Sequence, residues 1–522
     1  MSRRRKLILV FLGIMVASIG ARWISSPGYM DADYYYAMGK GLVSGEGLAE
    51  PFIWNYLSDP KGIPQPAFQY WMPFTSFLAA LGQLLFGVGF RAAQIPFILL
   101  AASFPLFTAW IANRLHGDPQ MAWESGLLAA APGFFLPFFV TTDAFSIYGM
   151  IGSLIFVLSI EAYREGGYLR WLLTGLLIGI AHLTRTDGLL FLPLSVGLIF
   201  YARQGKKTAL AGLMTGYLFV LLPWWIVNAV VHGRALSSGT IRVLWTLDYD
   251  DLFVYPPTIL TFQRWINSGI GNILLVRINA LWMNIKSLIL VNGLVFLGPL
   301  MVIGARILRK NLMVRLASIY LLFLIIIMSV IFPFAGSRGG YFHSSVAVMP
   351  ILWALAPLGL RRVVKFGARY RPWDILQATG FFTVATIILA CLTTLGIFWS
   401  RVVGDDHLNP TWSASARVYQ ETARWFDQEG IRDSVVAVNN PPGFYNASGL
   451  EAVFIPDGDL DMLREVVDTY QVQWVLLDSN APKGLQTIYE NPQQVPWLEW
   501  VESMDDSQGK DLLIFEVLEK HK

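Results

Sequence analysis

Cysteine and charge are both scarce in this chain of 522 residues. Only 14% of the residues are charged and 55% are hydrophobic, whereas a soluble domain carries about a quarter charged residues. The single cysteine, Cys391, lies inside an apolar run and can form no intrachain disulfide, so cysteine pairing does not indicate the compartment. The net charge of +3 is too small to indicate a nucleic-acid partner.

Glycine-rich nucleotide motifs are also missing. The sequence contains neither a P-loop nor a GxGxxG pattern, which argues against an enzyme that takes a sugar from a nucleotide. It also contains no internal repeat and no low-complexity tract.

Long apolar runs are what the chain has instead. They recur along it and are long enough to cross a bilayer, as in LASIYLLFLIIIMSVIF from Leu316 and GFFTVATIILACLTTLGIFW from Gly380. The sequence therefore predicts an α-helical polytopic membrane protein. Its basic N-terminus and short apolar run also fit a cleaved signal peptide, but the many later spans favour an uncleaved first helix.

The distribution of lysine and arginine predicts the orientation of the helices. Cytoplasmic loops carry an excess of basic residues, and every strongly basic loop falls on the side of the N-terminus if the chain crosses about eleven times. These groups are Arg3–Lys6, Arg114, Arg164 and Arg170, Arg203–Lys207, Arg306–Lys310 and Arg361–Arg369. We therefore expect a cytoplasmic N-terminus, and the apolar segment from Tyr70 must lie along or dip into the outer surface.

Composition divides the chain into two parts. Residues 1–400 form the predicted membrane domain, with outer loops 22–90 and 232–279, and residues 401–522 have the composition of a soluble domain. In this tail, SARVYQETARWFDQEG and DLDMLREVVDTYQ are typical of helices, while DSVVAVNN and VQWVLLDS are typical of buried strands. We expect a small extracytoplasmic α/β domain after the last membrane helix.

Asp31 and Asp33 stand out among the acidic residues predicted at the outer face. They follow the first apolar helix and precede three tyrosines in MDADYYYAMGKGLVSGEG. Partial desolvation there would raise the pKa of a carboxylate and make it a usable base. An Asp-x-Asp pair also offers hard oxygen ligands to a divalent cation. The alternative is that both are ordinary solvated loop acids.

The same segment resembles the first outer loop of the GT-C superfamily of glycosyltransferases. This superfamily includes protein O-mannosyltransferases, the lipid A aminoarabinose transferase and Rgt-type bacterial transferases. Its members commonly have an acidic residue soon after the first helix, then a tyrosine, then a small-residue turn. Asp31 takes the place of the catalytic acid, with Tyr35 and Gly39 following at helical spacing. Asp33 is a rival for the role, and the sequence leaves the choice between them open.

The resemblance covers nearly the whole chain in topology. PAFQYWMPFTSFLAALGQLLFG resembles the juxtamembrane helix of the family, and Asp143 lies in the second outer loop, where the family often has another acid. RTDG from Arg185 and SRGGYFHSSVAVMP from Ser337 also match in position. The resemblance implies inverting transfer of a sugar from a polyprenyl-phosphate donor to a glycan, lipid or protein acceptor. The reaction would take place at the outer face of a membrane, here the plasma membrane of a prokaryote.

Arg338 is the first candidate for the phosphate of such a donor. It follows an apolar helix between glycines that allow close backbone approach, and its planar guanidinium matches phosphate oxygens. An arginine that snorkels to lipid headgroups is the alternative. The expected site residues are Asp31 and Asp33 for catalysis; Arg338, His343, Arg185 and Lys61 for the donor phosphate; Tyr35, Glu46 and Asp143 for the acceptor or sugar; and Asp31, Asp33 and Asp143 for a divalent metal cation.

Two other functions compete with the transferase. A transporter or flippase of lipid-linked saccharides would show inverted repeats, interrupted helices and charges near the bilayer centre. Here the charged residues gather at one face, and the tail domain is expected on that same face. The third reading is a sugar-sensing or assembly protein on an inactive transferase fold.

Overall fold

The computed structural model describes residues 1–202, 205–231, 233, 235 and 239–518. Arg203 and His232, which were expected in an inner basic loop and at the start of an outer loop, lie outside the described residues.

Long helices dominate the first 400 residues. Among the described residues, eight helical segments are long and apolar enough to cross a membrane. Four of them are single helices: α1 (Arg3–Trp23), α4 (Phe90–His116), α7 (Phe145–Glu165) and α10 (Lys206–Val231). The segment Ile270–Asn292 contains α13 (Ile270–Ser287), Leu312–Ile331 contains α15 (Leu312–Ile326), and Ile375–Val403 contains α19 (Ile375–Phe398). The segment Pro333–Gly367 contains α16 (Pro333–Ala335), α17 (Tyr341–Ser345) and α18 (Met349–Gly367).

Shorter helices fill the spaces between these eight segments. Four are apolar: α3 (Phe74–Phe86), α8 (Tyr168–Thr184), Thr186–Tyr201 with α9 (Phe191–Tyr201), and α14 (Leu297–Ile307). The others are α2 (Met30–Ser44), α5 (Pro119–Ala129), α6 (Phe135–Phe139), α11 (Gly239–Arg242) and α12 (Phe262–Asn267). The predicted class of a polytopic helical membrane protein is confirmed, and the count of about eleven crossings stays a prediction.

Close contacts between helices depend on glycine. Where α10 crosses α8, a Cβ atom on Gly216 would lie 2.1 Å from the carbonyl oxygen of Leu172. Where α18 crosses α14, a Cβ atom on Gly359 would lie 1.9 Å from the carbonyl oxygen of Leu300. Lipid removes most of the hydrophobic drive for two helices to associate, so small residues that let backbones approach stabilise the pair by packing.

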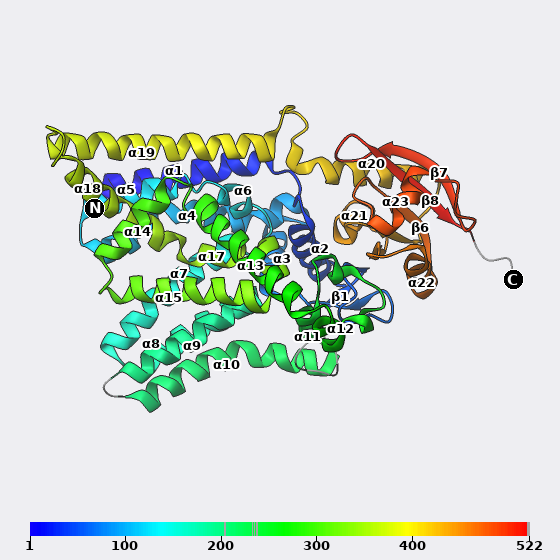
Figure 1. Ribbon diagram of the computed structural model, residues 1–522, viewed down its shortest axis with the longest axis horizontal. Coiled ribbons are helices and arrows are strands. Elements are labelled where there is room, and N and C mark those ends of the chain that lie inside the picture. The colour runs from blue at the N-terminus through cyan, green and yellow to red at the C-terminus, as the bar shows by residue number, and fades with distance from the viewer. Residues whose placement is uncertain (203–204, 232, 234, 236–238, 519–522) are drawn as a thin grey trace.

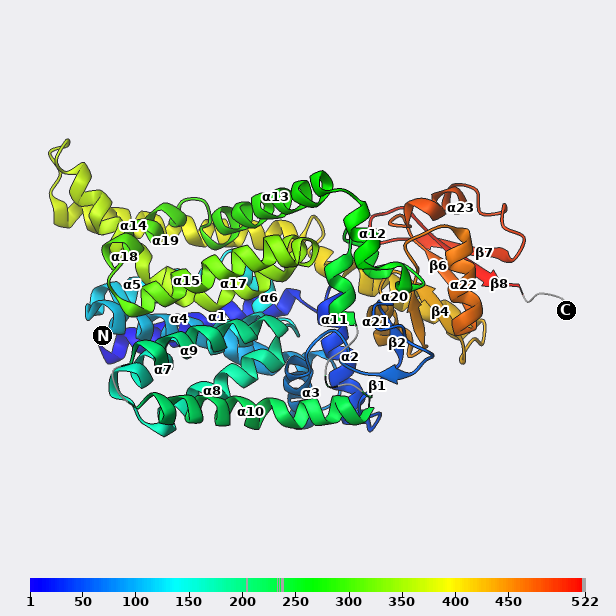
Figure 2. The same ribbon diagram turned by 60° about the horizontal axis from the view of Figure 1, so that its bottom comes forward.

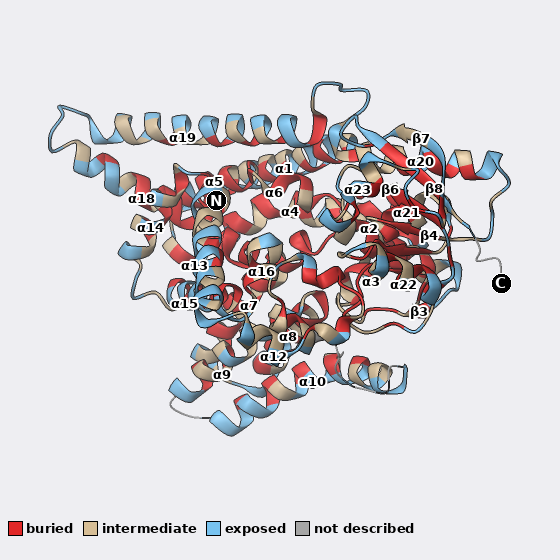
Figure 3. Ribbon diagram, turned by 45° about the vertical axis from the view of Figure 1, so that its right-hand side comes forward, coloured by how far each residue is buried: buried red, intermediate tan, exposed pale blue. Residues whose placement is uncertain are grey.

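One face of α19 is lined with exposed apolar side chains. Figure 3 shows this helix largely in the colour of exposed residues. Phe381, Val384, Ile388, Leu392 and Leu395 are each at least 52% exposed. They recur at helical spacing, which is the pattern of a helix that turns one side to lipid.

The tail forms the small α/β domain that the sequence predicts. Its helices are α20 (Ala414–Gln428), α21 (Pro441–Ser448), α22 (Leu460–Tyr470) and α23 (Gln486–Glu490). Its strands are β4 (Val435–Val438), β5 (Ala452–Phe454), β6 (Val472–Leu477), β7 (Leu498–Asp505) and β8 (Asp511–Val517). Strands β5, β4 and β6 run parallel, β8 pairs antiparallel with β6, and β7 pairs antiparallel with β8 at the edge of the sheet.

The sixth strand of this sheet comes from the membrane domain. Strand β2 (Phe52–Ile53), in the first outer loop, pairs in parallel with β5, so the order is β2-β5-β4-β6-β8-β7. The same loop also forms a two-stranded sheet from β1 (Ala49–Glu50) and β3 (Gln65–Pro66). The first outer loop and the tail are therefore joined by backbone hydrogen bonds.

The two parts of the chain lie end to end (Figure 1). The N-terminus and the connection from α18 to α19 lie at the end of the helical bundle away from the tail. Helix α2 lies at the junction between bundle and tail, and it keeps that place when the molecule is turned (Figure 2). The helix that carries both candidate acids therefore contacts both parts of the protein.

Candidate active site

Asp31 and Asp33 lie in the first turn of α2, where carboxylates are stabilised by the positive end of the helix. Two residues along an α-helix correspond to about 200° of rotation, so the two side chains point to nearly opposite sides. Asp31 faces the membrane bundle, where it meets His343, and Asp33 faces the tail, where it meets Asn440. The structure therefore separates the two rival acids.

Asp31, Asp143 and His343 form one cluster. Asp143 lies just before Ala144, the N-cap of α7, and His343 belongs to α17. The Nε2 atom of His343 lies 3.1 Å from Oδ2 of Asp143 and 3.8 Å from Oδ2 of Asp31. One ligand atom from each of the three residues lies within 4.8 Å of the others. Tyr29 donates a short hydrogen bond to Asp143, which fixes this carboxylate from the other side.

The other nitrogen of His343 determines how the ring is protonated. Its Nδ1 atom lies 2.9 Å from the carbonyl oxygen of Gly339, and a carbonyl can only accept, so Nδ1 carries the hydrogen. Gly339 has a φ of +150° that breaks the helix just before His343, a conformation that favours glycine. Nε2 therefore faces two carboxylates, an arrangement that is satisfied by a second proton or by a cation.

Burial and neighbouring charge adjust the two carboxyl groups differently. The pKa of Asp31 is raised to about 6, first by burial and then by repulsion from Asp143, against the attraction of His343 and Arg185. Burial also opposes ionisation of Asp143, but His343 and the hydrogen bonds from Tyr29 and the Ala144 amide outweigh it and lower its pKa. Asp143 is therefore the more acidic of the two groups, and Asp31 is the one that takes up a proton more readily.

Arg185 is a partly buried cation whose charge acts on this cluster. It follows α8, and its Nε atom lies 3.2 Å from both Oδ1 of Asp187 and Oγ of Ser344. Ser344 in turn donates a hydrogen bond to Asp187. The charge of Arg185 is therefore shared with Asp187, although it still lowers the pKa of Asp31.

Arg338 lies at the rim of the site. Its guanidinium carbon stands 4.9 Å from the ring centroid of Tyr249, a residue of the loop predicted over 232–279. The pKa of Tyr249 is raised to about 12 by burial and by the charge of Asp31, and the charge of Arg338 opposes this shift. Both Asp31 and Arg338 therefore influence the ionisation of Tyr249. Arg338 is exposed, and among the described residues it has no ion-pair partner.

Lys61 and Glu46 are not brought to the cluster. The Nζ atom of Lys61 lies 2.7 Å from Oδ2 of Asp59, and its side chain is 82% exposed. Glu46 is exposed at the end of α2 and accepts a hydrogen bond of 3.2 Å from the hydroxyl of Tyr445 in the tail. Their expected roles in binding phosphate and sugar have no support from these positions.

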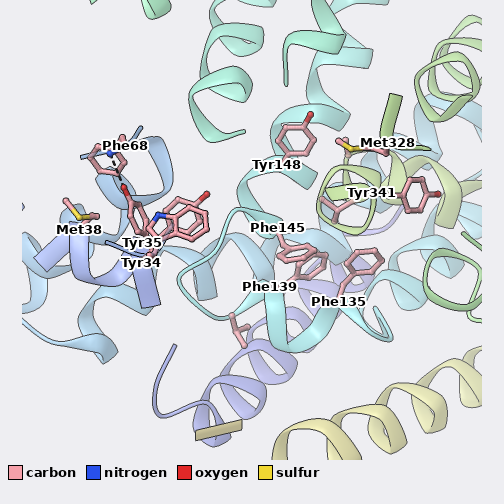
Figure 4. Close-up of a cluster of buried hydrophobic side chains, with 14 of the residues drawn as sticks. Tyr34, Tyr35, Met38, Phe68, Phe135, Phe139, Phe145, Tyr148, Met328 and Tyr341 are labelled. Carbon is pink, nitrogen blue, oxygen red and sulfur yellow. Dashed lines mark hydrogen bonds between the residues drawn. The ribbon is translucent and has the colours of Figure 1, made fainter. Parts of the chain in front are cut away.

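Tyr35 is buried beside the cluster. Burial raises its pKa well above the usual range, and the charges of Asp143 and Asp31 add to the shift. It packs with Tyr34 in an aromatic group, and Figure 4 shows these two rings together on one side and Phe145 with its neighbours on the other. The ring of Phe145 stacks on that of His343 with centroids 4.1 Å apart, so the cluster is bounded on this side by an apolar ring.

Asp33 is almost completely buried at the tail, with 6% of its surface exposed. Its Oδ2 atom accepts a hydrogen bond of 2.9 Å from Nδ2 of Asn440, and Nδ2 of Asn446 donates to its backbone oxygen at 3.0 Å. Burial raises its pKa to about 7 against the effect of these hydrogen bonds. Asp33 is not among the three residues whose ligand atoms converge.

Glu50 is a buried acid that the sequence did not single out as a site residue. It is 2% exposed and accepts hydrogen bonds from the hydroxyl of Tyr34 at 2.9 Å and from Nε2 of Gln65 at 3.1 Å. The hydroxyl of Tyr34 also accepts from the backbone amide of Phe68 at 2.9 Å (Figure 4). Burial raises the pKa of Glu50 to about 8. Its position next to PFIW was the available signal, and its contacts fasten the outer loop to α2.

The three converging residues fit a divalent cation. Two carboxylate oxygens and one imidazole nitrogen suit Zn²⁺ and other borderline cations. The fit rests on the orientation of the His343 ring. Its Nδ1 atom is hydrogen-bonded to Gly339, and its Nε2 atom faces the carboxylates of Asp31 and Asp143. Of the residues expected to hold a metal, Asp31 and Asp143 meet here, His343 joins them, and Asp33 does not.

The fold combines a multi-pass helical bundle, an acid-bearing helix after the first span and an α/β tail packed against that helix. The likeness expected from the sequence is confirmed in the solved structures that this chain resembles.

Two of these structures cover nearly all of the chain. ArnT from Cupriavidus metallidurans bound to undecaprenyl phosphate aligns with a TM-score of 0.58 and 13% identity, over 98% of this chain and 97% of that one. The Archaeoglobus fulgidus oligosaccharyltransferase in complex with Zn and sulfate aligns with a TM-score of 0.56 and 13% identity, over 98% of this chain and 72% of that one. Similarity at this level of identity establishes the fold.

A curated relative matches part of the sequence. Over 247 residues, 45% of this chain, the sequence is 26% identical to the undecaprenyl phosphate-alpha-4-amino-4-deoxy-L-arabinose arabinosyl transferase of Pseudomonas aeruginosa (strain UCBPP-PA14). The match spans 42% of that relative's length. No family model matches the chain.

Proposed function

We propose that this protein is an inverting glycosyltransferase that moves a sugar from a polyprenyl-phosphate donor to an acceptor hydroxyl at the outer face of the membrane. The observation that carries the proposal is the cluster at the start of α2, where Asp31 is held 3.8 Å from His343 beside Asp143. It is supported by the fold shared with ArnT, whose structure was determined with undecaprenyl phosphate.

The proposed base is Asp31. An acceptor hydroxyl attacks the anomeric carbon, the new carbon–oxygen bond forms as the bond to the donor phosphate breaks, and a carboxylate oxygen of Asp31 takes the hydroxyl proton. A pKa raised to about 6 leaves this carboxylate ionised at neutral pH and basic enough to accept a proton. Attack from the face opposite the departing phosphate inverts the anomeric centre.

The proposed contact for the donor phosphate is Arg338. The phosphate gains negative charge as it leaves, and it needs a cation that is not already neutralised. Arg185 is engaged by Asp187, whereas Arg338 contacts the face of Tyr249 and has no ion-pair partner within the part of the chain that the structure describes, so its N–H groups can bind phosphate oxygen atoms. Arg185 then acts from further inside by keeping the pKa of Asp31 from rising higher.

A divalent cation is the proposed cofactor. Asp31, Asp143 and His343 would hold it, and it would supply positive charge beside the leaving phosphate when bound. Tyr29 fixes the carboxylate of Asp143, and Gly339 fixes the ring of His343. Both ligands are thus oriented by a second contact, as metal ligands commonly are.

The direct test of the function is mass spectrometry of lipids and glycans from cells with the wild-type protein, without it, and with Asp31→Asn. The transferase predicts a product heavier by one sugar residue that is lost in both altered strains, together with accumulation of the lipid-linked sugar. A lipid-linked saccharide that changes sides of the membrane with no covalent product would contradict the proposal and favour a flippase.

A further inference from the structure

The tail domain has an edge of the kind at which open α/β sheets bind ligands. Such sheets bind at the carboxyl ends of their parallel strands, at the point where the strand order reverses. Strand β5 pairs with β4 on one side and β6 pairs with it on the other, so the reversal is at β4. Asn439 and Asn440 follow β4, Asp478 follows β6, and Nδ2 of Asn439 lies 2.7 Å from Oδ1 of Asp478.

A side chain of the membrane domain occupies this edge. Asn440 caps the eight-residue helix α21, its Oδ1 accepting from the amide of Gly443 at 3.2 Å, and its Nδ2 donates to Oδ2 of Asp33 at 2.9 Å. A Cβ atom on Gly443 would lie 3.0 Å from the same carboxylate oxygen. The carboxylate of Asp33 thus lies against the N-terminal turn of α21, where negative charge is stabilised.

Other contacts hold the two ends of the segment 27–46, which contains Asp33. At its start, Nε1 of Trp412 donates to the carbonyl oxygen of Pro27 at 3.1 Å, and the Trp412 ring meets that of Tyr29 edge to face at 5.7 Å. At its end, Tyr445 donates to Glu46. Strand β2 then joins the sheet of the tail. Asp33 is the charged contact in the middle of this docked segment.

We propose that the tail domain uses its ligand-binding edge as an intramolecular receptor for Asp33, and that this docking fixes the rotation of α2 and aims Asp31 at Asp143 and His343. Asp33 is then a positioning residue and not a catalytic residue. Because the two carboxylates point in opposite directions from one helical turn, holding one sets the direction of the other. The kinetic consequence rests on the proposed transferase function, and the docking itself does not.

An exchange of the two side chains tests the proposal. Asn440→Asp keeps an acceptor for the Gly443 amide, since aspartate is a good helix cap, but it places a second carboxylate against Asp33. Asp33→Asn retains one neutral hydrogen bond to Asn440. In the double variant, the amide at position 33 donates to the carboxylate at position 440, so the pair is restored with its polarity reversed.

Two measurements on the purified full-length protein are made at pH 8, with Asn480→Asp as the matched control. Asn480 follows β6 at the same edge, and its Oδ1 accepts from Nε2 of Gln508 at 3.0 Å, so the control adds a charge without facing α2. Hydrogen–deuterium exchange over residues 27–46 reports docking whether or not the protein is active. Turnover of a polyprenyl-phosphate sugar donor, measured as kcat and KM separately, reports whether Asp31 is correctly oriented.

Asn440→Asp is expected to speed exchange over residues 27–46 about tenfold, because the two neighbouring carboxylates repel each other. It should also lower kcat about tenfold and leave the donor KM unchanged within about twofold. The double variant should return both measurements to within about threefold of wild type, and the control should match wild type. A double variant that stays as impaired as Asn440→Asp in both measurements would overturn the proposal, as would an Asp33→Asn kcat as low as that of Asp31→Asn. If no variant and no wild-type protein transfers sugar, the exchange data alone decide the docking, and the transferase function fails separately.

Discussion

At the scale of single residues, the site depends on which side chains each carboxylate contacts. Asp31 and Asp33 are two residues apart, but Asp31 meets Asp143 and His343 while Asp33 meets Asn440. Helical geometry alone explains the separation. The sequence could indicate that both acids lie where a membrane helix meets water. It could not indicate which one faces the bundle, because that depends on the tail that packs against α2.

The residue-scale prediction concerns Arg338. Lysine keeps the charge but cannot make the two parallel contacts that a guanidinium makes with phosphate, so Arg338→Lys should weaken donor binding clearly and Arg338→Ala more severely, by about tenfold or more in kcat/KM. Steady-state kinetics with varied donor measure this.

Arg432→Lys, an exposed change in the tail, is the matched control and should behave as wild type. Wild-type kinetics from both Arg338 variants would show that the residue interacts only with lipid headgroups, and would move the phosphate contact to Arg185.

At the scale of elements, hydrophobic patterns predicted the helices and the tail strands well, because each lies in a continuous segment with its own period. Strand β2 was not predicted. It has two residues, Phe52 and Ile53, and it exists because β5 offers an open edge almost four hundred residues later. A strand stabilised by a distant partner carries little local signal.

The element-scale prediction concerns the crossing of α14 and α18. Because a Cβ atom on Gly359 would lie 1.9 Å from the carbonyl oxygen of Leu300, Gly359→Ala should push the helices apart and destabilise the protein by about 1–3 kcal/mol. The melting temperature in detergent measures this effect. Gly380→Ala in α19, where nothing lies within 4 Å of the added atom, should leave the melting temperature unchanged or slightly raised. Equal melting temperatures for the two variants would mean that this contact does not hold the bundle together.

At the scale of the whole molecule, the N-terminus and the tail lie at opposite ends of the bundle (Figure 1). The positive-inside rule predicts a cytoplasmic N-terminus, so the tail and the cluster around Asp31 should face the other side. The sequence predicted this orientation from its basic loops, which do not depend on how the helices pack.

A cysteine introduced at exposed Ser507 tests the orientation in a Cys391→Ser background. A membrane-impermeant thiol reagent should label Ser507→Cys in intact cells. Tyr370→Cys, between α18 and α19 and 73% exposed, should be labelled only after the cells are permeabilised. The reverse pattern would place the active site in the cytoplasm.

The most direct test of the account is the pH dependence of sugar transfer by wild-type protein and by Asp31→Asn. A general base must be ionised, and the pKa of Asp31 is raised to about 6 when no cation is bound to the cluster. Wild-type kcat/KM measured without added divalent cation should therefore be constant above neutrality and fall about tenfold per pH unit below about 6, whereas a bound cation should move this fall to lower pH. Asp31→Asn should lose about 10²–10⁴-fold in kcat at pH 8 and should show no fall in rate near pH 6. A folded Asp31→Asn protein with near wild-type kcat, or with the wild-type loss of activity below pH 6, would contradict the assignment of Asp31 as the base.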